Sequence, residues 1–414
     1  MTDDFTPEES ARLRRVLNRS AVIRSERHRR HRRFAAAWTA GALAVAMVAA
    51  ANLRTELRRT VLPGEQASTD ETRTTAAPAA PAGRDTWTSA VFGAGTGGIA
   101  TGAGRVYAMA SDRLVAALDA RTGHILWTHP AGGEGPAGKT VATVDFAGGL
   151  VLAAGPDVPL QALVAESGTL AWTTSGTSPT VAVGGVAVAG GTVVAANDAG
   201  IAAFRVADGA PVWAVDEPGA REASAGGDLV VAAVGRDGGA LLAADAATGT
   251  TRWRVTLPSP AAGRAAFFEG DPVVVDAAGR LSRLDRATGS TVYRVDAAGC
   301  GSCVEGGATG SQPTVVGSTV VVGTPGGVVA VDGPTGRVLW RHPTDSPVTS
   351  SPAPLAGRVA VGIASPPAVV ELDAATGRER ARHPLPAPPG PRVLAAGATL
   401  TAAAQDGRVH ALRR

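Results

Sequence analysis

The chain has 414 residues and a net charge of +3, and it contains seven Trp although aromatic residues make up only 4% of it. This length favours two domains or one repeat array, and the 53 Gly and 28 Pro argue against a mainly helical protein. The positive charge is local: residues 1–59 hold 13 Arg and six acidic residues, which leaves −4 for residues 60–414. The larger part therefore lacks the basic surface typical of nucleic-acid binding, and we expect no nucleic-acid partner.

Residues 1–33 predict a basic cytoplasmic segment that is partly helical. Thr6 to Glu9 has the pattern of a helix start, with an N-cap hydroxyl, a Pro in the first turn and a Glu three residues after the cap. A run rich in Arg follows, from Arg24 to Arg33. This run is typical of a segment that sets membrane orientation and attracts anionic lipid headgroups. The alternative is a docking helix for a cytoplasmic partner.

Residues 34–53 predict a single transmembrane helix. These 20 residues contain no charged side chain, and that length crosses a bilayer. Arg is more abundant before the span than after it, so the N-terminus should stay in the cytoplasm and the rest should be extracytoplasmic. A cleaved signal peptide is the alternative, with Ala49 to Ala51 as the cleavage site. Residues 54–84 are rich in Thr, Ala and Pro, and we expect a disordered linker there.

A repeated hairpin motif runs through residues 85–414. Its clearest copy is Gly326 to Trp340, in which Val328 to Val331 reads as a short strand and Asp332 to Gly336 as a turn. The Asp carboxylate can accept hydrogen bonds from turn amides, and the Gly can adopt the positive φ that closes the turn.

The other copies align on the turn and on the aromatic residue after it. The aligned aromatic residues are Trp127, Trp172, Trp213, Trp253, Tyr293 and Trp340, and the last copy has Ala381 there. The turn acids are Asp119, Asp245, Asp285, Asp332 and Asp373, and two copies have Val164 and Arg205 instead. The turn glycines Gly123, Gly168, Gly209, Gly249, Gly289, Gly336 and Gly377 lie 45, 41, 40, 40, 47 and 41 residues apart. That spacing is typical of a four-stranded propeller blade.

Two incomplete copies predict how the propeller closes. Asp406 to Leu412 forms the first half of the motif without its turn, and Thr86-Trp87-Thr88 is an aromatic strand without a preceding motif. Pairing the two would build an eighth blade from both ends of the domain and close the ring. We therefore expect an all-β, eight-bladed propeller over residues 85–414.

The pattern Ala-Xaa-Asp-Xaa-Xaa-Thr-Gly-Xaa-Xaa-Xaa-Trp resembles the repeat of the pyrroloquinoline quinone (PQQ)-type propellers. That superfamily includes quinoprotein alcohol dehydrogenases, a scaffold lipoprotein of the outer-membrane β-barrel assembly machine, and sensor ectodomains of bacterial kinases. The resemblance implies that each aligned aromatic residue, Trp87 included, docks against the neighbouring blade. Quinoprotein dehydrogenases use adjacent cysteines and a calcium site to hold PQQ, whereas Cys300 and Cys303 here are separated by two residues.

The pair Cys300 and Cys303 is expected to form a structural disulfide, because an extracytoplasmic location is oxidising. A redox-active pair and a metal site are the alternatives, although no βαβ pattern surrounds the pair and no second Cys pair accompanies it. His129, His342 and His383 each precede Pro at the same position of the repeat, so we interpret them as structural.

The expected function is a membrane-anchored, extracytoplasmic scaffold that binds a protein or an envelope polymer on one propeller face. No catalytic, metal-binding or cofactor-binding residue is predicted, and the turn Asp and the aromatic residues are assigned structural roles. Two alternatives remain: an oxidoreductase that uses PQQ, and a sensor ectodomain that signals through a cytoplasmic partner.

Overall fold

The computed structural model describes residues 85–90, 98–109, 114–131, 143–155, 158–174, 186–197, 199–235, 238–297, 312–396 and 399–413. Every element in this part is a β-strand, and its 32 strands form eight four-stranded antiparallel sheets. Within these residues no helix is long and apolar enough to cross a bilayer. The predicted segments 1–33, 34–53 and 54–84 and the pair Cys300 and Cys303 lie outside the described residues.

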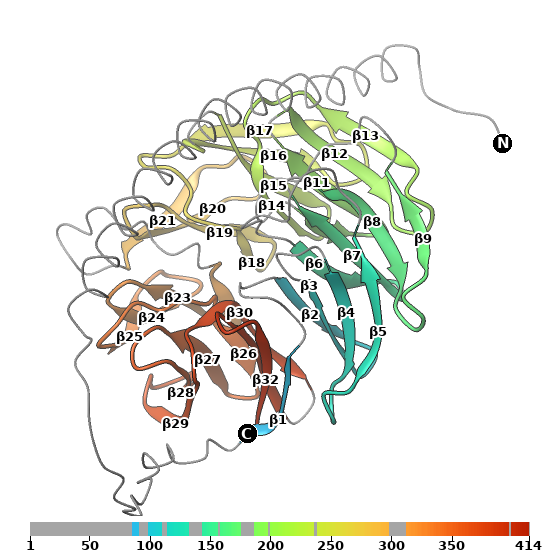
Figure 1. Cartoon of the computed structure of the whole chain (residues 1–414). Helices are drawn as coiled ribbons and strands as arrows, with labels where there is room; N and C mark the ends of the chain where they lie inside the picture. The colour runs from blue at the N-terminus through green and yellow to red at the C-terminus, as the bar shows by residue number, and fades with distance from the viewer. Residues whose placement is uncertain are drawn as a thin grey trace, which may run out of the picture. The chain divides into compact units, whose positions relative to one another are not determined.

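Seven sheets are consecutive meanders, each running from the first strand to the fourth (Figure 1). The first two comprise β2 (Gly98–Gly102), β3 (Arg105–Met109), β4 (Leu114–Asp119) and β5 (Ile125–Pro130), then β6 (Thr143–Ala147), β7 (Leu150–Gly155), β8 (Val158–Val164) and β9 (Leu170–Thr173). The next two comprise β10 (Val186–Ala189), β11 (Thr192–Asn197), β12 (Gly200–Arg205) and β13 (Pro211–Val215), then β14 (Arg221–Gly226), β15 (Leu229–Val234), β16 (Ala240–Asp245) and β17 (Thr251–Thr256). The last three comprise β18 (Ala266–Phe268), β19 (Asp271–Val275), β20 (Arg280–Leu284) and β21 (Thr291–Asp296); β22 (Thr314–Val316), β23 (Thr319–Thr324), β24 (Gly327–Asp332) and β25 (Val338–Pro343); and β26 (Ala353–Leu355), β27 (Arg358–Ile363), β28 (Ala368–Asp373) and β29 (Glu379–Pro384).

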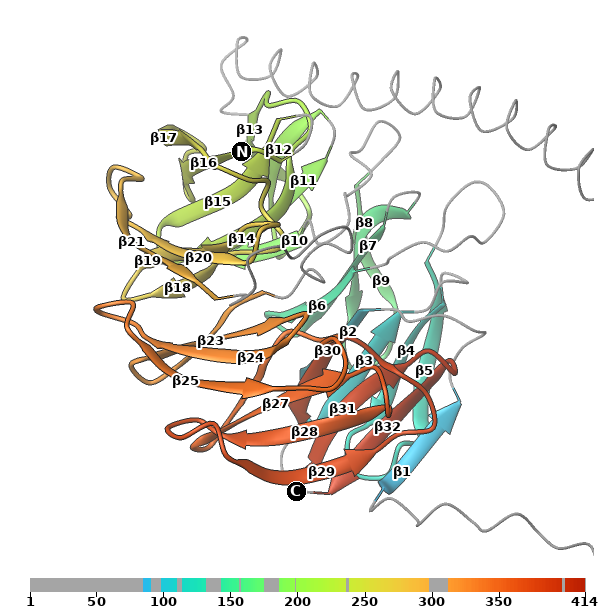
Figure 2. The same ribbon diagram turned by 90° about the vertical axis from the view of Figure 1, so that its left-hand side faces the viewer.

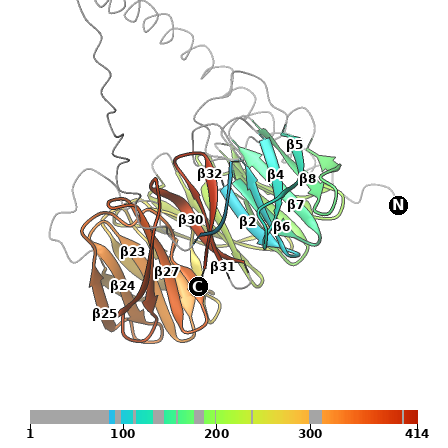
Figure 3. The same cartoon turned by 60° about the horizontal axis from the view of Figure 1, so that its bottom comes forward.

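The eighth sheet is built from both ends of the domain, as predicted. β1 (Asp85–Ala90) pairs with β32 (Arg408–Arg413), which continues to β31 (Thr399–Ala404) and β30 (Pro389–Ala396). Figures 1 and 2 both show β1, in blue, beside the red strand β32. In this register Trp87 lies opposite Ala411, and His410 is hydrogen-bonded to Thr88 (3.3 Å) and Asp406 (3.2 Å). The first strands of all eight sheets contact one another in sequence around the ring, and β30 contacts β2 (Figure 3). The prediction of an eight-bladed propeller is therefore confirmed.

The core of the propeller lies between successive sheets rather than at its centre. The buried apolar residues form eight clusters, and each cluster combines strands of two neighbouring sheets. The middle strands are buried on both faces for this reason, which explains their Val- and Ala-rich runs without polar alternation. The outer strands show the alternation expected of a half-exposed edge, as in β21.

An aromatic latch joins six of the eight described outer strands to the next sheet. The indole of the outer-strand Trp stacks on the turn glycine of the next sheet. The indole Nε1–H donates to a backbone carbonyl of the same turn, that of the residue after the Asp position, as in Ala120 after Asp119. The six bonds join Trp87 to Ala120 (3.1 Å), Trp127 to Ala165 (3.0 Å), Trp172 to Val206 (2.7 Å), Trp213 to Ala246 (2.9 Å), Trp253 to Arg286 (2.9 Å) and Trp340 to Ala374 (2.9 Å). We call this contact the latch.

The two copies without Trp differ in how the contact is replaced. Tyr293 stacks on Gly336 but has no indole N–H, and the guanidinium of Arg283, which lies opposite Tyr293, donates to the Gly333 carbonyl at 3.1 Å instead. Gly333 is the position that a Trp would reach in this copy. Ala381 faces the closing sheet, where β32 and β1 are the two ends of the domain and no turn joins them. A Trp at this position would have no turn glycine on which to stack.

A turn glycine supports the latch by adopting a positive φ and by leaving space for the indole. Two substitutions separate these contributions. Gly249 has φ +72°, and a Cβ there would lie 2.7 Å from the Trp213 ring; Gly191 has φ +86°, and nothing lies within 4 Å of its Cβ position. We expect Gly191→Ala to lose about 1–2 kcal/mol through left-handed backbone strain. Gly249→Ala should lose roughly a further 1–3 kcal/mol because the methyl group displaces the indole. Urea unfolding of both variants measures the difference, and equal losses would refute the steric part of the latch.

Candidate functional site

The repeat acids lie in the turns between third and fourth strands, where their carboxylates are occupied as acceptors. Asp119 Oδ1 accepts hydrogen bonds from the Thr122 hydroxyl (2.9 Å) and amide (2.8 Å), and these bonds lower the pKa of Asp119. Arg252 and the Thr248 amide lower the pKa of Asp245 to about 2, and Arg380 and Thr376 lower that of Asp373 to about 2. Asp285 and Asp332 bond the Thr of their own turns in the same way.

The two copies without this Asp keep the same backbone turn. Gly168 N donates to Val164 O at 2.8 Å, and Gly209 N donates to Arg205 O at 2.9 Å. Gly123, Gly249, Gly289, Gly336 and Gly377 make the same bond in the other five copies. The carboxylate is therefore dispensable for the turn, whereas every copy has the glycine.

The His-Pro pairs end outer strands β5, β25 and β29. His383 differs from the other two because it is buried, and its Nε2 lies 2.9 Å from Oε1 of Glu371. Arg358 Nη1 donates to the other carboxylate oxygen of Glu371 at 3.0 Å. Glu371 stands opposite Ala381, whereas the latched copies have Ala opposite Trp. We interpret this group as structural.

An apolar rim patch, defined as Ile125, Leu126 and Leu170, lies on the outer strands β5 and β9 of two successive sheets. These side chains are 46%, 46% and 48% exposed, and the fourth large exposed apolar residue of the described part, Val292, lies alone on β21. The equivalent positions on β17 and β29 are Thr251 with Arg252 and Glu379 with Arg380. At these positions the outer rim is therefore apolar on β5 and β9 and polar on β17 and β29.

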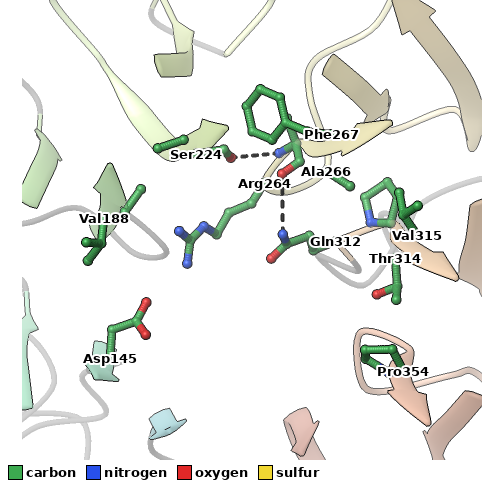
Figure 4. Close-up of a pocket in the computed structure, with 14 residues that line it drawn as sticks. Asp145, Val188, Ser224, Arg264, Ala266, Phe267, Gln312, Thr314, Val315 and Pro354 are labelled. Atoms are coloured by element: carbon green, nitrogen blue, oxygen red, sulfur yellow. Dashed lines mark hydrogen bonds between the residues drawn. The ribbon is translucent and has the colours of Figure 1, made fainter. Parts of the chain in front are cut away.

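A cavity of about 500 Å³ lies at the inner edges of the sheets. Its lining comes from the first strands of six sheets, from β6 to β26, and from the segments that lead into β18 and β22. Val188, Phe267 and Pro354 contribute apolar surface, while Thr314 and Gln312 contribute polar groups (Figure 4). This volume is within the range of small-molecule sites in proteins.

Arg264 extends into this cavity, between Val188 and Asp145 (Figure 4). The backbone beside it is held by the Ala265 amide, which donates to Ser224 Oγ at 2.8 Å, and by Gln312 Nε2, which donates to Ala265 O at 3.3 Å. The Nε of Arg264 donates to the Ala223 carbonyl at 3.0 Å. Burial, and then the positive charge of Arg392, lower the pKa of Arg264 to about 10, so the guanidinium remains charged at neutral pH.

Glu222 is the second unusual charge near the cavity. It lies in β14 at an irregular step of the strand and has φ +54°. Burial raises the pKa of Glu222 to about 7, against the opposing charges of Arg264 and Arg221. The carboxyl therefore changes its protonation state near neutral pH rather than near pH 4.5.

Sequence reasoning missed Arg264, Glu222 and Arg392, because none of them belongs to the repeat motif. Arg264 stands alone in a run of small and apolar residues between Leu257 and Phe268. An isolated Arg in such a run is a signal that could have been noted. Nothing in the sequence indicates that Glu222 of β14 and Arg392 of β30 act electrostatically on Arg264.

The described residues do not form a metal site. Among them, no three side chains of His, Cys, Asp or Glu are grouped so that they could share a metal ion. Asp145 is the one carboxylate in the described cavity lining. A hard cation such as Ca²⁺ prefers six to eight oxygen ligands with several carboxylates, so this wall does not fit it.

A family model described as outer membrane protein assembly factor BamB matches residues 71–230 and 197–414. Outer membrane protein assembly factor BamB of Bordetella pertussis is 31% identical over 189 residues, which are 43% of this chain and 46% of that protein, so the match spans about half of the relative. The crystal structure of BamB from Moraxella catarrhalis is similar with a TM-score of 0.59 and 22% identity, over 76% of this chain and 93% of that one. A europium-containing methanol dehydrogenase is similar with a TM-score of 0.61 and 14% identity, over 78% and 84% of the two chains.

The raised pKa of Glu222 predicts a pH-dependent stability. Because the folded protein favours the protonated carboxyl, the free energy of unfolding should fall as pH rises from about 4.5 to about 7 and stay level above that. Glu222→Gln removes the ionisation, so the variant should be more stable than the parent by about 1–3 kcal/mol at pH 8 and nearly equal to it at pH 4.5. Urea unfolding at the two pH values tests this. The same difference at both would show that Glu222 ionises normally.

Proposed function

Because the chain belongs to the family described as outer membrane protein assembly factor BamB, we propose that its propeller is a protein-binding scaffold. We further propose that residues 34–53 anchor it in the cell membrane and that the propeller is extracytoplasmic. The partner is a protein of the cell envelope that docks on the outer rim. The observation that carries this proposal is the apolar rim patch.

The patch has the properties of a protein-docking surface. Isolated exposed apolar residues are normal, but neighbouring ones on successive elements mark interaction sites. β5 and β9 are the fourth strands of successive sheets, and Trp127 of β5 donates to Ala165 in the turn that leads to β9. Both are fourth strands, and within the described residues no further strand pairs with their outer edges. An extended partner segment could pair with such an edge while its apolar side chains cover Ile125 and Leu170.

PQQ-dependent oxidation is the alternative that the fold suggests, and the described residues do not favour it. The cavity wall offers Asp145 as its one described carboxylate, and the described residues hold no group of metal ligands. Calcium-assisted PQQ chemistry requires such a group. We therefore derive no catalytic step for this cavity.

Site-specific photo-crosslinking in native membranes tests the proposed rim. A photoreactive phenylalanine analogue at Leu126 or Leu170 should give the same discrete protein adduct, because both side chains would face the partner. The same analogue at Val292 is the matched control, since Val292 is equally exposed but stands alone. Equal adducts at Val292, or none at Leu126 and Leu170, would contradict a docking site at this rim.

The proposed anchor has its own test. The full chain should remain in the membrane pellet after alkaline extraction and should retain an N-terminal epitope tag. Replacing Leu43 and Val45 with Arg should release it, because charged residues at the centre of a span are costly to insert. A soluble parent chain that begins near Asn52 would instead identify residues 34–53 as a cleaved signal peptide.

A further inference from the structure

The terminal end of the Arg264 guanidinium faces the cavity. Its Nε is engaged by the Ala223 carbonyl, and within the described residues no hydrogen bond is formed by either Nη atom. In Figure 4 this end points into open space between Val188 and Asp145. The bond at Nε fixes the plane of the guanidinium, so its two terminal nitrogens form a pre-oriented fork.

The surrounding charges neutralise the positive charge of the Arg264 guanidinium only in part. Arg392 adds a second positive charge, while Asp145 and Glu222 are the acids that act on Arg264. Arg392 is itself held by the carbonyls of Ile99 (3.3 Å) and Val144 (3.4 Å), and Asp145 accepts a hydrogen bond from the Phe146 amide at 2.9 Å. When Glu222 is protonated, Asp145 is the one other acid that acts on Arg264, against the added positive charge of Arg392. The cavity then carries a net positive charge.

We propose that this cavity binds an organic carboxylate with a small apolar body, held by Arg264. A planar guanidinium with two free terminal nitrogens matches the two oxygens of a carboxylate. The cavity of about 500 Å³ is too large for a simple anion alone, and Val188, Phe267 and Pro354 provide apolar walls for the rest of the ligand. Thr314 and Gln312 lie on the same wall and can orient its polar groups.

This site differs from the proposed docking rim in place and in ligand. The cavity is lined by first strands, whereas Ile125, Leu126 and Leu170 belong to fourth strands. Loss of one function therefore need not affect the other.

Glu222 makes the binding depend on pH. As pH rises through about 7, its carboxyl becomes an anion that repels the ligand and neutralises Arg264. Arg221, Arg392 and Asp145 are the other charged groups that act on Glu222 or Arg264. Carboxylate affinity should therefore fall from pH 6 to pH 8.

Calorimetry with the full-length chain in detergent and 4-phenylbutyrate as the probe tests the proposal. The parent should bind the probe about threefold to tenfold more tightly at pH 6 than at pH 8, and Glu222→Gln should remove this difference. Arg264→Gln should weaken binding at pH 6 by about tenfold or more, because the charge-assisted pair is lost. Arg254→Gln, which changes an exposed Arg of β17, is the matched control and should bind like the parent.

Two further probes separate the carboxylate from other ligands. The uncharged 4-phenylbutyramide should not bind, and inorganic phosphate should compete weakly. Tight binding of the amide, or phosphate binding as strong as that of the probe, would overturn the proposal.

If Arg264→Gln does not fold, Val188→Trp provides the second variant. It fills the cavity without changing its charge and should abolish binding of the probe. Binding that survives in Val188→Trp would refute the site. Leu170→Asp should leave probe binding unchanged, so failure at the cavity is distinguishable from failure at the rim.

Discussion

The contact on which the propeller depends is the stacking of an aromatic ring on a glycine of the next sheet. In the next sheet, the contact requires a residue with positive φ and no Cβ, which is glycine. In the sheet of the aromatic residue, it is accompanied by a small residue opposite the ring. Six Trp lie opposite an Ala in their own sheets, such as Ala243 opposite Trp253. The indole N–H then satisfies a carbonyl of the turn. One contact thus fixes the turn, the outer strand and the angle between two sheets.

The repeat made most of this architecture predictable, because these residue types recur at a constant spacing. Even the closure by β1 and β32 could be inferred, since an unpaired half-motif at each end leaves few alternatives. The replacement of an indole N–H by Arg283 could not be predicted, because it involves residues 50 positions apart in two sheets. The cavity charges were missed for the same reason: Glu222 and Arg264 belong to different sheets and to no motif.

The two proposed sites lie on parts of the sheet that the latch leaves free. First strands and the segments that lead into β18 and β22 line the centre, and none of the latch residues is among the described lining residues. Outer-strand residues that precede the Trp face solvent, so Ile125 can be apolar where Thr251 is polar. Chemistry on such a scaffold is decided by substitutions at these positions, which explains why a shared fold does not determine a shared activity.

The strand β1 makes two contacts that close the ring. It pairs with β32 to complete the eighth sheet, and its Trp87 forms the latch to the β2–β5 sheet. The sheet before it offers no compensating latch, since Ala381 stands where a Trp would be. β1 is the first of the described strands in the sequence, and its partner β32 is the last of them. More than three hundred residues separate these two paired strands. Closure of the ring therefore depends on a strand pairing of much longer range than the hairpins inside the other seven sheets.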